Sequence, residues 1–397
     1  MSTLKVDAIR HNSATSDAIT TAADGTCTAR ITGMTGGGGL SHRNIVINGA
    51  MLVAQRGVTS NSTGYQTVDR ITTTTSGGID NACTYAQVDV ASGTTPYTLG
   101  FRKAFKITNG DQSSIATNDY VYFTYNFESQ DIANSGWNYT STSSYITLSF
   151  WVKSSVAQDF HGYLKTNDGT AQLYSFSTGS LTANTWTKVT KTIPGNSNLQ
   201  FDNDNNTGLL LRIAGYMGTY RTGSLTQNQW AAYNSSIRYP NFTNTWFDTN
   251  DATLEFTGLQ LEVGDTATSF EHRSFGDELT RCRRYCYVLG FPNVGDSYER
   301  VARGQGYDST RTRITVFHPT EMRAKASSVT IPDVSQWQIS DTSNGYLPSA
   351  YELTANVNGV LSTGMQFTHA SGATAYRNYF LERRGTTAGK VIIDAEL

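Results

Sequence analysis

Alternation of hydrophobic and polar residues with a period of two dominates the chain. The clearest runs, alternating or wholly apolar, are rich in Thr, Val, Ile, Leu and aromatic residues: Tyr145–Val152, Trp186–Ile193, Leu209–Ile213 and Ala252–Val263. Such runs predict β-strands, because successive side chains of a strand point to opposite faces of a sheet. Turn-forming residues follow several strands, as in Thr166–Gly169 and Pro194–Ser197. Many short strands separated by such turns indicate β-sandwiches.

One segment departs from this alternation. Leu279, Cys282 and Cys286 recur at a helical spacing, with two acidic residues in the first turn and arginines in the last. This order favours a helix, because acidic side chains stabilise the N-terminus of a helix and basic ones its C-terminus. We predict a linker helix at 274–288, with the two cysteines as small buried side chains and not as zinc ligands.

Residues 1–40 differ from the rest of the chain. They are rich in Thr, Ala and Gly and poor in large apolar residues, so they could not bury a core alone. The run Gly36–Gly39 predicts a hinge or a tight turn at the end of this segment. We therefore expect an all-β protein: an extended N-terminal segment at 1–40, a β-sandwich at 41–273, the linker helix, and a second β-sandwich at 289–397.

The composition excludes several function classes. The 397 residues are 38% hydrophobic and only 16% charged, and 22 Tyr, 17 Phe and 6 Trp can bury a core. The net charge is −2, so neither nucleic-acid binding nor binding to an anionic membrane is expected. No run of 18 apolar residues suggests membrane insertion, and the first residues lack the apolar stretch of a secretion signal. We expect a soluble protein without a cleaved leader.

No catalytic constellation emerges from the sequence. The histidines are scattered, and Asp159 and His161 merely share a face of a predicted strand. The stretch Asp202–Gly208 resembles the start of a calcium loop, but its glycine falls one place late and Ile213 stands where a bidentate Glu is needed. A turn is the favoured interpretation, and a structural calcium stays open. We predict no catalytic residue, no metal ligand and no cofactor.

Aromatic residues in polar, turn-rich stretches are the candidate ligand-binding residues: Trp137, Tyr139, Trp230 and Tyr233. Flat rings flanked by Asn, Gln and Ser suit sugars, which present an apolar C–H face and a rim of hydroxyls. The alternative is ordinary packing beneath a long loop.

Several stretches together resemble the tail-fibre and receptor-binding proteins of tailed bacteriophages: Asn48–Met51, Gln55–Gly57, Val68–Arg70, Leu148–Val152, Thr192–Gly195, Gly258–Gly264, Phe270–Leu279, Ala302–Gly304, His318–Ala324 and Ile392–Leu397. The opening Ser2–Ile9, with Ala23–Gly25, is similar to virion proteins of marine phages, especially those of cyanobacteria. The likeness covers nearly the whole chain. Ile71 and Ser269 depart from the pattern, where Trp and Pro are expected.

The resemblance implies a homotrimeric virion protein with a jelly roll similar to carbohydrate-binding modules and a host-facing C-terminal domain. We expect a tail fibre that adheres to a host-surface receptor, a glycan or an outer-membrane component. Residues 1–40 would attach it to a tail adaptor, nozzle or other virion protein. It would be made in the host cytoplasm and reside in the virion tail. The alternatives are a polysaccharide depolymerase and a capsid-decorating or collar fibre without receptor activity.

Overall fold

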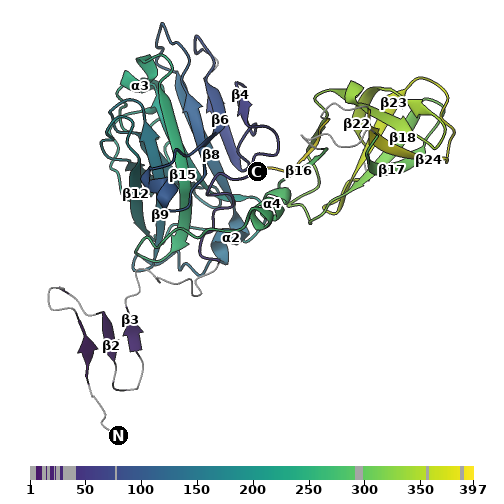
Figure 1. Cartoon of the computed structure of the whole chain (residues 1–397). Coiled ribbons are helices and arrows are strands. Elements are labelled where there is room, and N and C mark those ends of the chain that lie inside the picture. The colour runs from purple at the N-terminus through teal and green to yellow at the C-terminus, as the bar shows by residue number, and fades with distance from the viewer. Residues whose placement is uncertain are drawn as a thin grey trace.

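The computed structural model describes residues 6–10, 15, 18–21, 23, 27–29, 42–76, 78–290, 298–354, 357–384 and 389–397. Strands make up nearly all of its regular structure, which confirms the all-β fold class. Figure 1 shows two β-lobes with one helix, α4 (Phe275–Arg283), between them.

The first lobe is a sandwich of two antiparallel sheets of six strands each. One sheet has the order β14 (Trp230–Ala232), β11 (Gln172–Ser177), β10 (His161–Thr166), β13 (Thr207–Met217), β8 (Tyr120–Glu128), β5 (Ile71–Thr75). The other has the order β12 (Thr187–Pro194), β9 (Tyr145–Ser154), β15 (Thr253–Val263), β7 (Lys103–Thr108), β6 (Thr84–Asp89), β4 (Thr59–Ser60). The four clearest runs of the sequence lie in β9, β12, β13 and β15.

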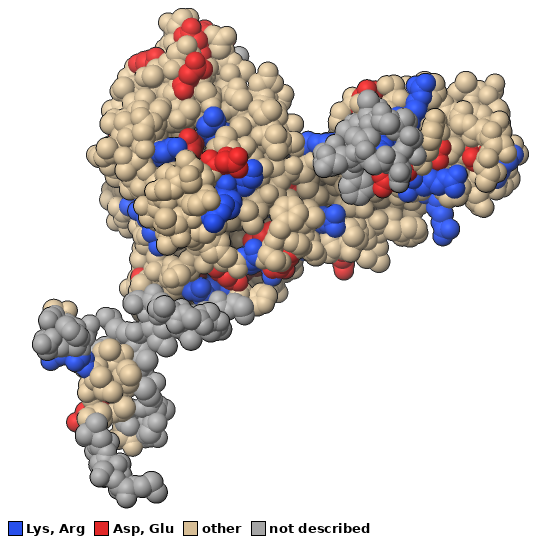
Figure 2. All heavy atoms as spheres, viewed as in Figure 1, with Lys and Arg blue, Asp and Glu red and all other residues tan. Residues whose placement is uncertain are grey.

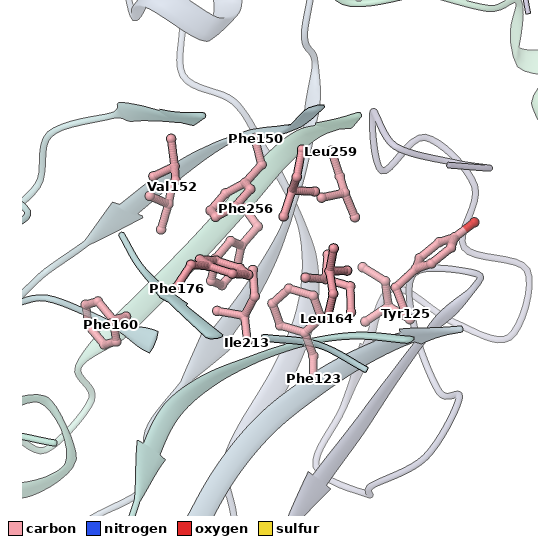
Figure 3. Close-up of a cluster of buried hydrophobic side chains, with 14 of the residues drawn as sticks. Phe123, Tyr125, Phe150, Val152, Phe160, Leu164, Phe176, Ile213, Phe256 and Leu259 are labelled. Atoms are coloured by element: carbon pink, nitrogen blue, oxygen red, sulfur yellow. The ribbon is translucent and has the colours of Figure 1, made fainter. Parts of the chain in front are cut away.

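Side chains from both sheets fill the space between the layers of this lobe (Figure 3). Phe123 of one sheet meets Phe256 of the other with ring centroids 4.8 Å apart, and Phe150 lies 6.1 Å from Phe256. All three rings are at most 1% exposed. Alternate residues of the strands therefore form the core, as the period of two predicts.

Helices are short and lie between strands: α1 (Thr95–Thr98), α2 (Ser129–Ala133), α3 (Thr245–Asp248), η1 (Thr219–Arg221) and η2 (Val334–Gln336). Helix α4 begins after Ser274, whose hydroxyl accepts a hydrogen bond from the Asp277 amide. It ends at Arg283, and residues 286–288 of the predicted helical segment 274–288 belong to strand β16 (Cys286–Leu289) instead. Pairing with a distant strand outweighs the local helical spacing there. The thiols of Cys282 and Cys286 are buried and unpaired.

The second lobe contains a larger and a smaller antiparallel sheet. The seven-stranded sheet has the order β21 (Gly345–Tyr346), β20 (Trp337–Ser340), β24 (Asn378–Arg383), β17 (Arg300–Gly306), β18 (Arg311–Phe317), β23 (Ser362–His369), β22 (Pro348–Leu353). The three-stranded sheet has the order β16 (Cys286–Leu289), β25 (Val391–Asp394), β19 (Ser328–Thr330). Trp337, Phe367 and Tyr379, none of them exposed, lie in their common core.

The N-terminal residues include a small antiparallel sheet, β1 (Ala8–Ile9), β2 (Ile19–Thr21) and β3 (Cys27–Ala29). In Figure 1 it stands apart from both lobes. The Gly36–Gly39 run lies outside the described residues. Among the helices of the described part of the chain, none is long and apolar enough to cross a membrane.

The last residues of the chain leave the second lobe and lie against the first, where Figure 1 marks the C-terminus. The Tyr65 hydroxyl and the Asn126 amide both donate to the Leu397 carbonyl, at 3.0 and 3.2 Å. Glu396 forms ion pairs with Arg56, at 3.3 Å, and with Arg70. The end of the chain therefore fastens the two lobes together.

Arg323 of the second lobe completes this junction. Its guanidinium donates to the carbonyls of Asn205 at 2.6 Å, Ala395 at 2.9 Å and Glu396 at 3.2 Å. Its backbone amide donates to the Arg284 carbonyl at the end of α4, at 2.7 Å. One side chain thus ties a loop of the first lobe to the tail of the chain.

Candidate functional site: an aromatic groove on the second lobe

A groove of about 710 Å³ lies on the outer face of the seven-stranded sheet. Strands β17, β18, β23 and β24 supply its floor, and the segment before β23 and the loop before β24 supply its rim. Its lining includes Arg303, Gln305, Tyr307, Arg313, Thr315, Phe317, Val357, Gly364, Tyr376, Asn378 and Phe380.

Strand register explains which side chains face the groove. Arg303 of β17 is paired with Thr315 of β18 on one side and with Phe380 of β24 on the other. Because paired residues of neighbouring strands share a face, these three form one outward row. Their neighbours along each strand, such as Ile314 and Leu381, point to the opposite face and are buried in the core.

Aromatic rings stand unusually open around this groove. Phe317 is 70% exposed, Tyr376 is 84% exposed and Tyr307 is 45% exposed. Large exposed apolar groups gathered at one concave surface mark binding sites, whereas single ones carry little information. Flat rings beside amide and guanidinium groups can hold a sugar by ring contact and by hydrogen bonds to its hydroxyls.

Backbone contacts fix the loop that carries Tyr376. The Tyr376 amide donates to the Gly306 carbonyl, and the Gly306 amide donates to the Arg377 carbonyl, both at 2.9 Å. A Cβ at Gly306 would lie 2.2 Å from the Thr374 carbonyl oxygen, so glycine is required for this close approach. Tyr376 itself has a left-handed φ of 64°, a conformation that neighbouring structure must hold.

Arg313 is held in place on the groove wall. Its guanidinium carbon lies 3.9 Å from the centroid of the Tyr307 ring, and its Nε donates to the Gln366 side chain at 3.1 Å. Gln366 donates in turn to Glu352 at 2.6 Å. On the face shown in Figure 2, most of the surface of the two lobes is neither acidic nor basic.

Of the residues predicted from the sequence, Trp137 and Tyr139 lie together in a loop of the first lobe. Trp137 is 3% exposed, and its indole nitrogen donates to the Ser144 carbonyl at 3.3 Å. Tyr139 is half-buried and meets Phe201 edge-on, with ring centroids 4.9 Å apart. Both rings therefore pack beneath the loop, which leaves little of Trp137 for a ligand.

Trp230 and Tyr233 lie at the edge strand β14. Trp230 is 9% exposed and donates to the Pro194 carbonyl at 2.7 Å. Its edge borders a polar hollow of about 450 Å³ that Gln172, Asn198 and Gln200 also line. The Lys165 ammonium lies 5.0 Å from the centroid of the half-buried Tyr233 ring. The binding role of all four aromatic residues stays a prediction. The hollow beside Trp230 is the most open surface near any of them.

The Asp159–His161 pair and the stretch that resembles a calcium loop both lie on the first lobe. His161 and Asp159 are 3.6 Å apart, and burial lowers the pKa of His161 below its usual value. Residues 202–206 form a loop in which the Asp204 carboxylate accepts a hydrogen bond from the Asn206 backbone amide at 3.0 Å, and Thr207 and Gly208 begin strand β13. Within the described ranges, no group of three or more His, Cys, Asp or Glu side chains is placed to hold a metal ion.

One motif behind the phage resemblance, Phe270–Leu279, holds part of the fold together. Glu271 accepts the backbone amides of His42 and Asn44, at 2.6 and 2.7 Å, and Glu278 accepts that of Asn48 at 2.7 Å. The side chain of Arg273 donates to the carbonyl of Asn44. Phe270–Leu279 therefore clamps the start of the first sandwich.

No protein-family model matches the chain, and no curated protein does. Among solved structures, the enzymatically active domain of tailspike protein 4 from bacteriophage CBA120 is similar over 56% of this chain, with 10% identity and a TM-score of 0.29. The chain spans only 21% of that domain's length.

Two further solved structures are covered completely by this chain. A putative sugar binding protein from Bacteroides thetaiotaomicron matches 56% of the chain, with 11% identity and a TM-score of 0.28. The tandem CBM22-1-CBM22-2 domain of Paenibacillus barcinonensis Xyn10C matches 91% of the chain, with 9% identity and a TM-score of 0.26. None of these likenesses assigns a ligand to this chain.

Sequence reasoning missed the groove on the second lobe. A usable signal is present in β18, where Arg313, Thr315 and Phe317 alternate with the buried Ile314 and Val316. An aromatic residue on the polar face of an alternating strand is out of place for packing. Tyr376 gives no comparable signal, because its position depends on a loop contact with Gly306.

Proposed function

We propose that this chain is a phage tail-fibre protein that binds a glycan of the host surface through the groove of the second lobe. The observation that carries the proposal is the open aromatic wall formed by Tyr307, Phe317 and Tyr376 around polar groups. The sequence resemblance to phage receptor-binding proteins supplies the biological setting.

We further propose that the protein acts as a homotrimer attached to the virion through residues 1–40. Each sugar contact in an open groove is weak, because water competes for the same hydroxyls. Several copies on one particle raise the effective concentration of the remaining sites once one of them is bound. The mass of the full chain in solution tests this part directly, and a monomer at every concentration would contradict it.

The proposed activity is binding without cleavage. Aromatic, guanidinium and amide groups line the groove, whereas hydrolysis of a glycosidic bond requires two carboxyl groups on opposite sides of that bond. Incubation of the full chain with host-surface polysaccharide should release no reducing ends. Sustained release would favour a depolymerase instead.

The binding test uses the full chain and immobilised polysaccharide extracted from cells to which the particles adsorb. Phe317→Ala and Tyr376→Ala should each weaken binding about tenfold, equivalent to about 1.4 kcal/mol. Tyr220→Ala removes a ring of similar exposure, 56%, from the first lobe and should leave binding unchanged. Equal binding by all three variants would refute a role for the groove.

A further inference from the structure

The groove contains two positive charges without a negative partner. The side chain of Arg303 makes no hydrogen bond, ion pair or ring contact with any residue in the described part of the chain. Arg313 contacts only the neutral side chains of Tyr307 and Gln366 there. The lining described for the groove includes no Asp or Glu.

Other arginines of the same lobe show the opposite arrangement. Arg300 lies 3.2 Å from Glu382, Arg311 lies 2.5 Å from Asp308, and Arg377 lies 3.1 Å from Asp341. Carboxylates are thus available to this lobe, and each of these partners lies outside the groove lining. Both arginines of the groove lining thus lack the carboxylate partner that these three arginines have.

The two unpaired guanidinium groups belong to one surface. Arg303 pairs with Thr315, and Gln305 pairs with Arg313, so the two arginines are diagonal neighbours on adjacent strands. Diagonal neighbours on one face are roughly 7–8 Å apart, within reach of a single small anion for side chains of this length. Like charges at this spacing repel each other, and an anionic group between them removes that repulsion.

We propose that the groove selects acidic saccharides, with Arg303 and Arg313 holding the carboxylate or phosphate group of the sugar. This inference rests on the proposed glycan-binding function and names its ligand class. The planar guanidinium group presents parallel N–H donors that match both anions. The Tyr307 ring and the Gln366 amide orient Arg313, so that less side-chain freedom is lost on binding.

The sugar ring itself has a place beside these charges. Phe380 pairs with Arg303 in the outward row, and the 70% exposed Phe317 follows Thr315 on the same face. At Gly364, which pairs with Thr315, a Cβ would lie 2.5 Å from the Val357 side chain. A glycine there lets Val357 approach the floor and close the end of the groove.

The test compares matched pairs of immobilised saccharides with the full chain. Each pair contains a glucuronate, galacturonate or N-acetylneuraminate oligosaccharide and the same compound with its carboxylate reduced to an alcohol. Mannose 6-phosphate and mannose form the phosphate arm. At least one acidic member should bind tenfold or more tightly than its neutral partner, and added salt should reduce that preference.

Variants assign this preference to the arginines. Arg303→Gln and Arg313→Gln should each reduce the acidic-to-neutral ratio at least fivefold, and Arg303→Lys should retain part of it. Arg221→Gln makes the same change in net charge on the first lobe and should leave the ratio unchanged. Arg303 has no internal partner in the described residues, so its variants should unfold at the same temperature as the wild-type protein.

The outcomes separate this inference from the proposed function. Equal binding of acidic and neutral members, both weakened by Phe317→Ala, would overturn the acidic preference and leave glycan binding intact. An acidic preference that survives Arg303→Gln and Arg313→Gln would also overturn the assignment. No saccharide binding at all, with a solution mass that Phe317→Ala reduces, would show a groove covered by a second copy and would refute both proposals.

Discussion

Replacing Glu396 by glutamine removes one negative charge from the buried junction between the two lobes. The Glu396 side chain is 3% exposed and faces Arg70 and Arg56, whose side chains are 1% and 5% exposed. Burial alone would lower the pKa of Arg70, but the charge of Glu396 and the nearby tyrosine side chains together outweigh burial and raise that pKa. The junction therefore depends on this carboxylate to neutralise a cation that water cannot reach.

The expected loss of stability follows from what each arginine retains. Arg56 keeps Asp394 at 2.7 Å. Arg70 keeps only neutral partners: the Asn126 carbonyl at 2.7 Å and the rings of Tyr285 and Tyr125, whose centroids lie 3.4 and 5.4 Å from its guanidinium carbon. Removing one partner of a buried ion pair costs about 3–5 kcal/mol. Because glutamine still accepts a hydrogen bond, we expect Glu396→Gln to lower the free energy of unfolding by about 3 kcal/mol.

Urea unfolding of the full chain at pH 7 measures this loss. Hydrogen exchange of the Ala395 amide, which donates to the Tyr285 carbonyl at 2.8 Å, reports on the junction if the lobes unfold separately. Asp89→Asn is the control, because Asp89 pairs with Lys103 at 2.6 Å on the surface and is 81% exposed. It should cost less than about 1 kcal/mol.

A second variant tests the physical reason. Replacing Arg70 and Glu396 together by methionine leaves no buried charge unpaired, so the double variant should be more stable than the sum of the single losses implies. If Glu396→Gln behaves like Asp89→Asn, or if the methionine substitutions are additive, the junction is not held by this ion pair.

Two further predictions concern the first lobe. Gly258→Ala should destabilise this lobe by about 1–3 kcal/mol in urea unfolding, because Gly258 has a φ of 64° and a Cβ there would lie 2.6 Å from the Phe101 ring. Gly276→Ala is the control, because a Cβ at Gly276 would stand in open space, and it should not lower stability. Equal losses for the two variants would contradict the reasoning. Burial raises the pKa of Asp69 to about 6, above its unfolded value, so its folded form binds more protons between about pH 4 and 6 and its contribution to stability falls as pH rises through that window. Between about pH 4 and 6, the free energy of unfolding of Asp69→Asn should therefore rise relative to that of the wild-type protein, by up to about 1.4 kcal/mol per pH unit. A difference in stability that does not change with pH would refute the assignment.

Local patterns in the sequence predict much of the fold and little of the candidate site. The alternation in Tyr145–Val152 and Ala252–Val263 depends on neighbours along the chain, and both segments are strands. Cys286–Leu289 is a strand because it pairs with β25, more than 100 residues away. The groove depends on such distant contacts throughout: Tyr376 is placed by Gly306, and Arg303 by its register with Thr315.

The aromatic residues in loops also show that local sequence does not determine exposure. Polar neighbours around Trp137 and Trp230 suggest exposed rings, yet both indoles are buried, and each donates to a backbone carbonyl. A Trp beneath a loop and a Trp on a loop have the same neighbours in sequence. Only the path of the loop, here held by the Pro194–Phe201 segment, distinguishes the two cases.

Most of the phage-like motif residues discussed above lie at the junction of the lobes, whereas the exposed aromatic residues of the groove lie outside the motifs. Asp69, Arg70, Arg323 and Glu396 all belong to such motifs, and all meet at the junction of the lobes. Phe317 and Tyr376 lie outside every motif, on a strand end and a loop that the junction does not constrain. A protein of this architecture that keeps its junction can therefore change its groove without loss of the fold. Arg303 and Gly304 belong both to a motif and to the groove lining. Arg303 is the one of the two with a side chain, so a change of ligand and a change of framework would coincide there.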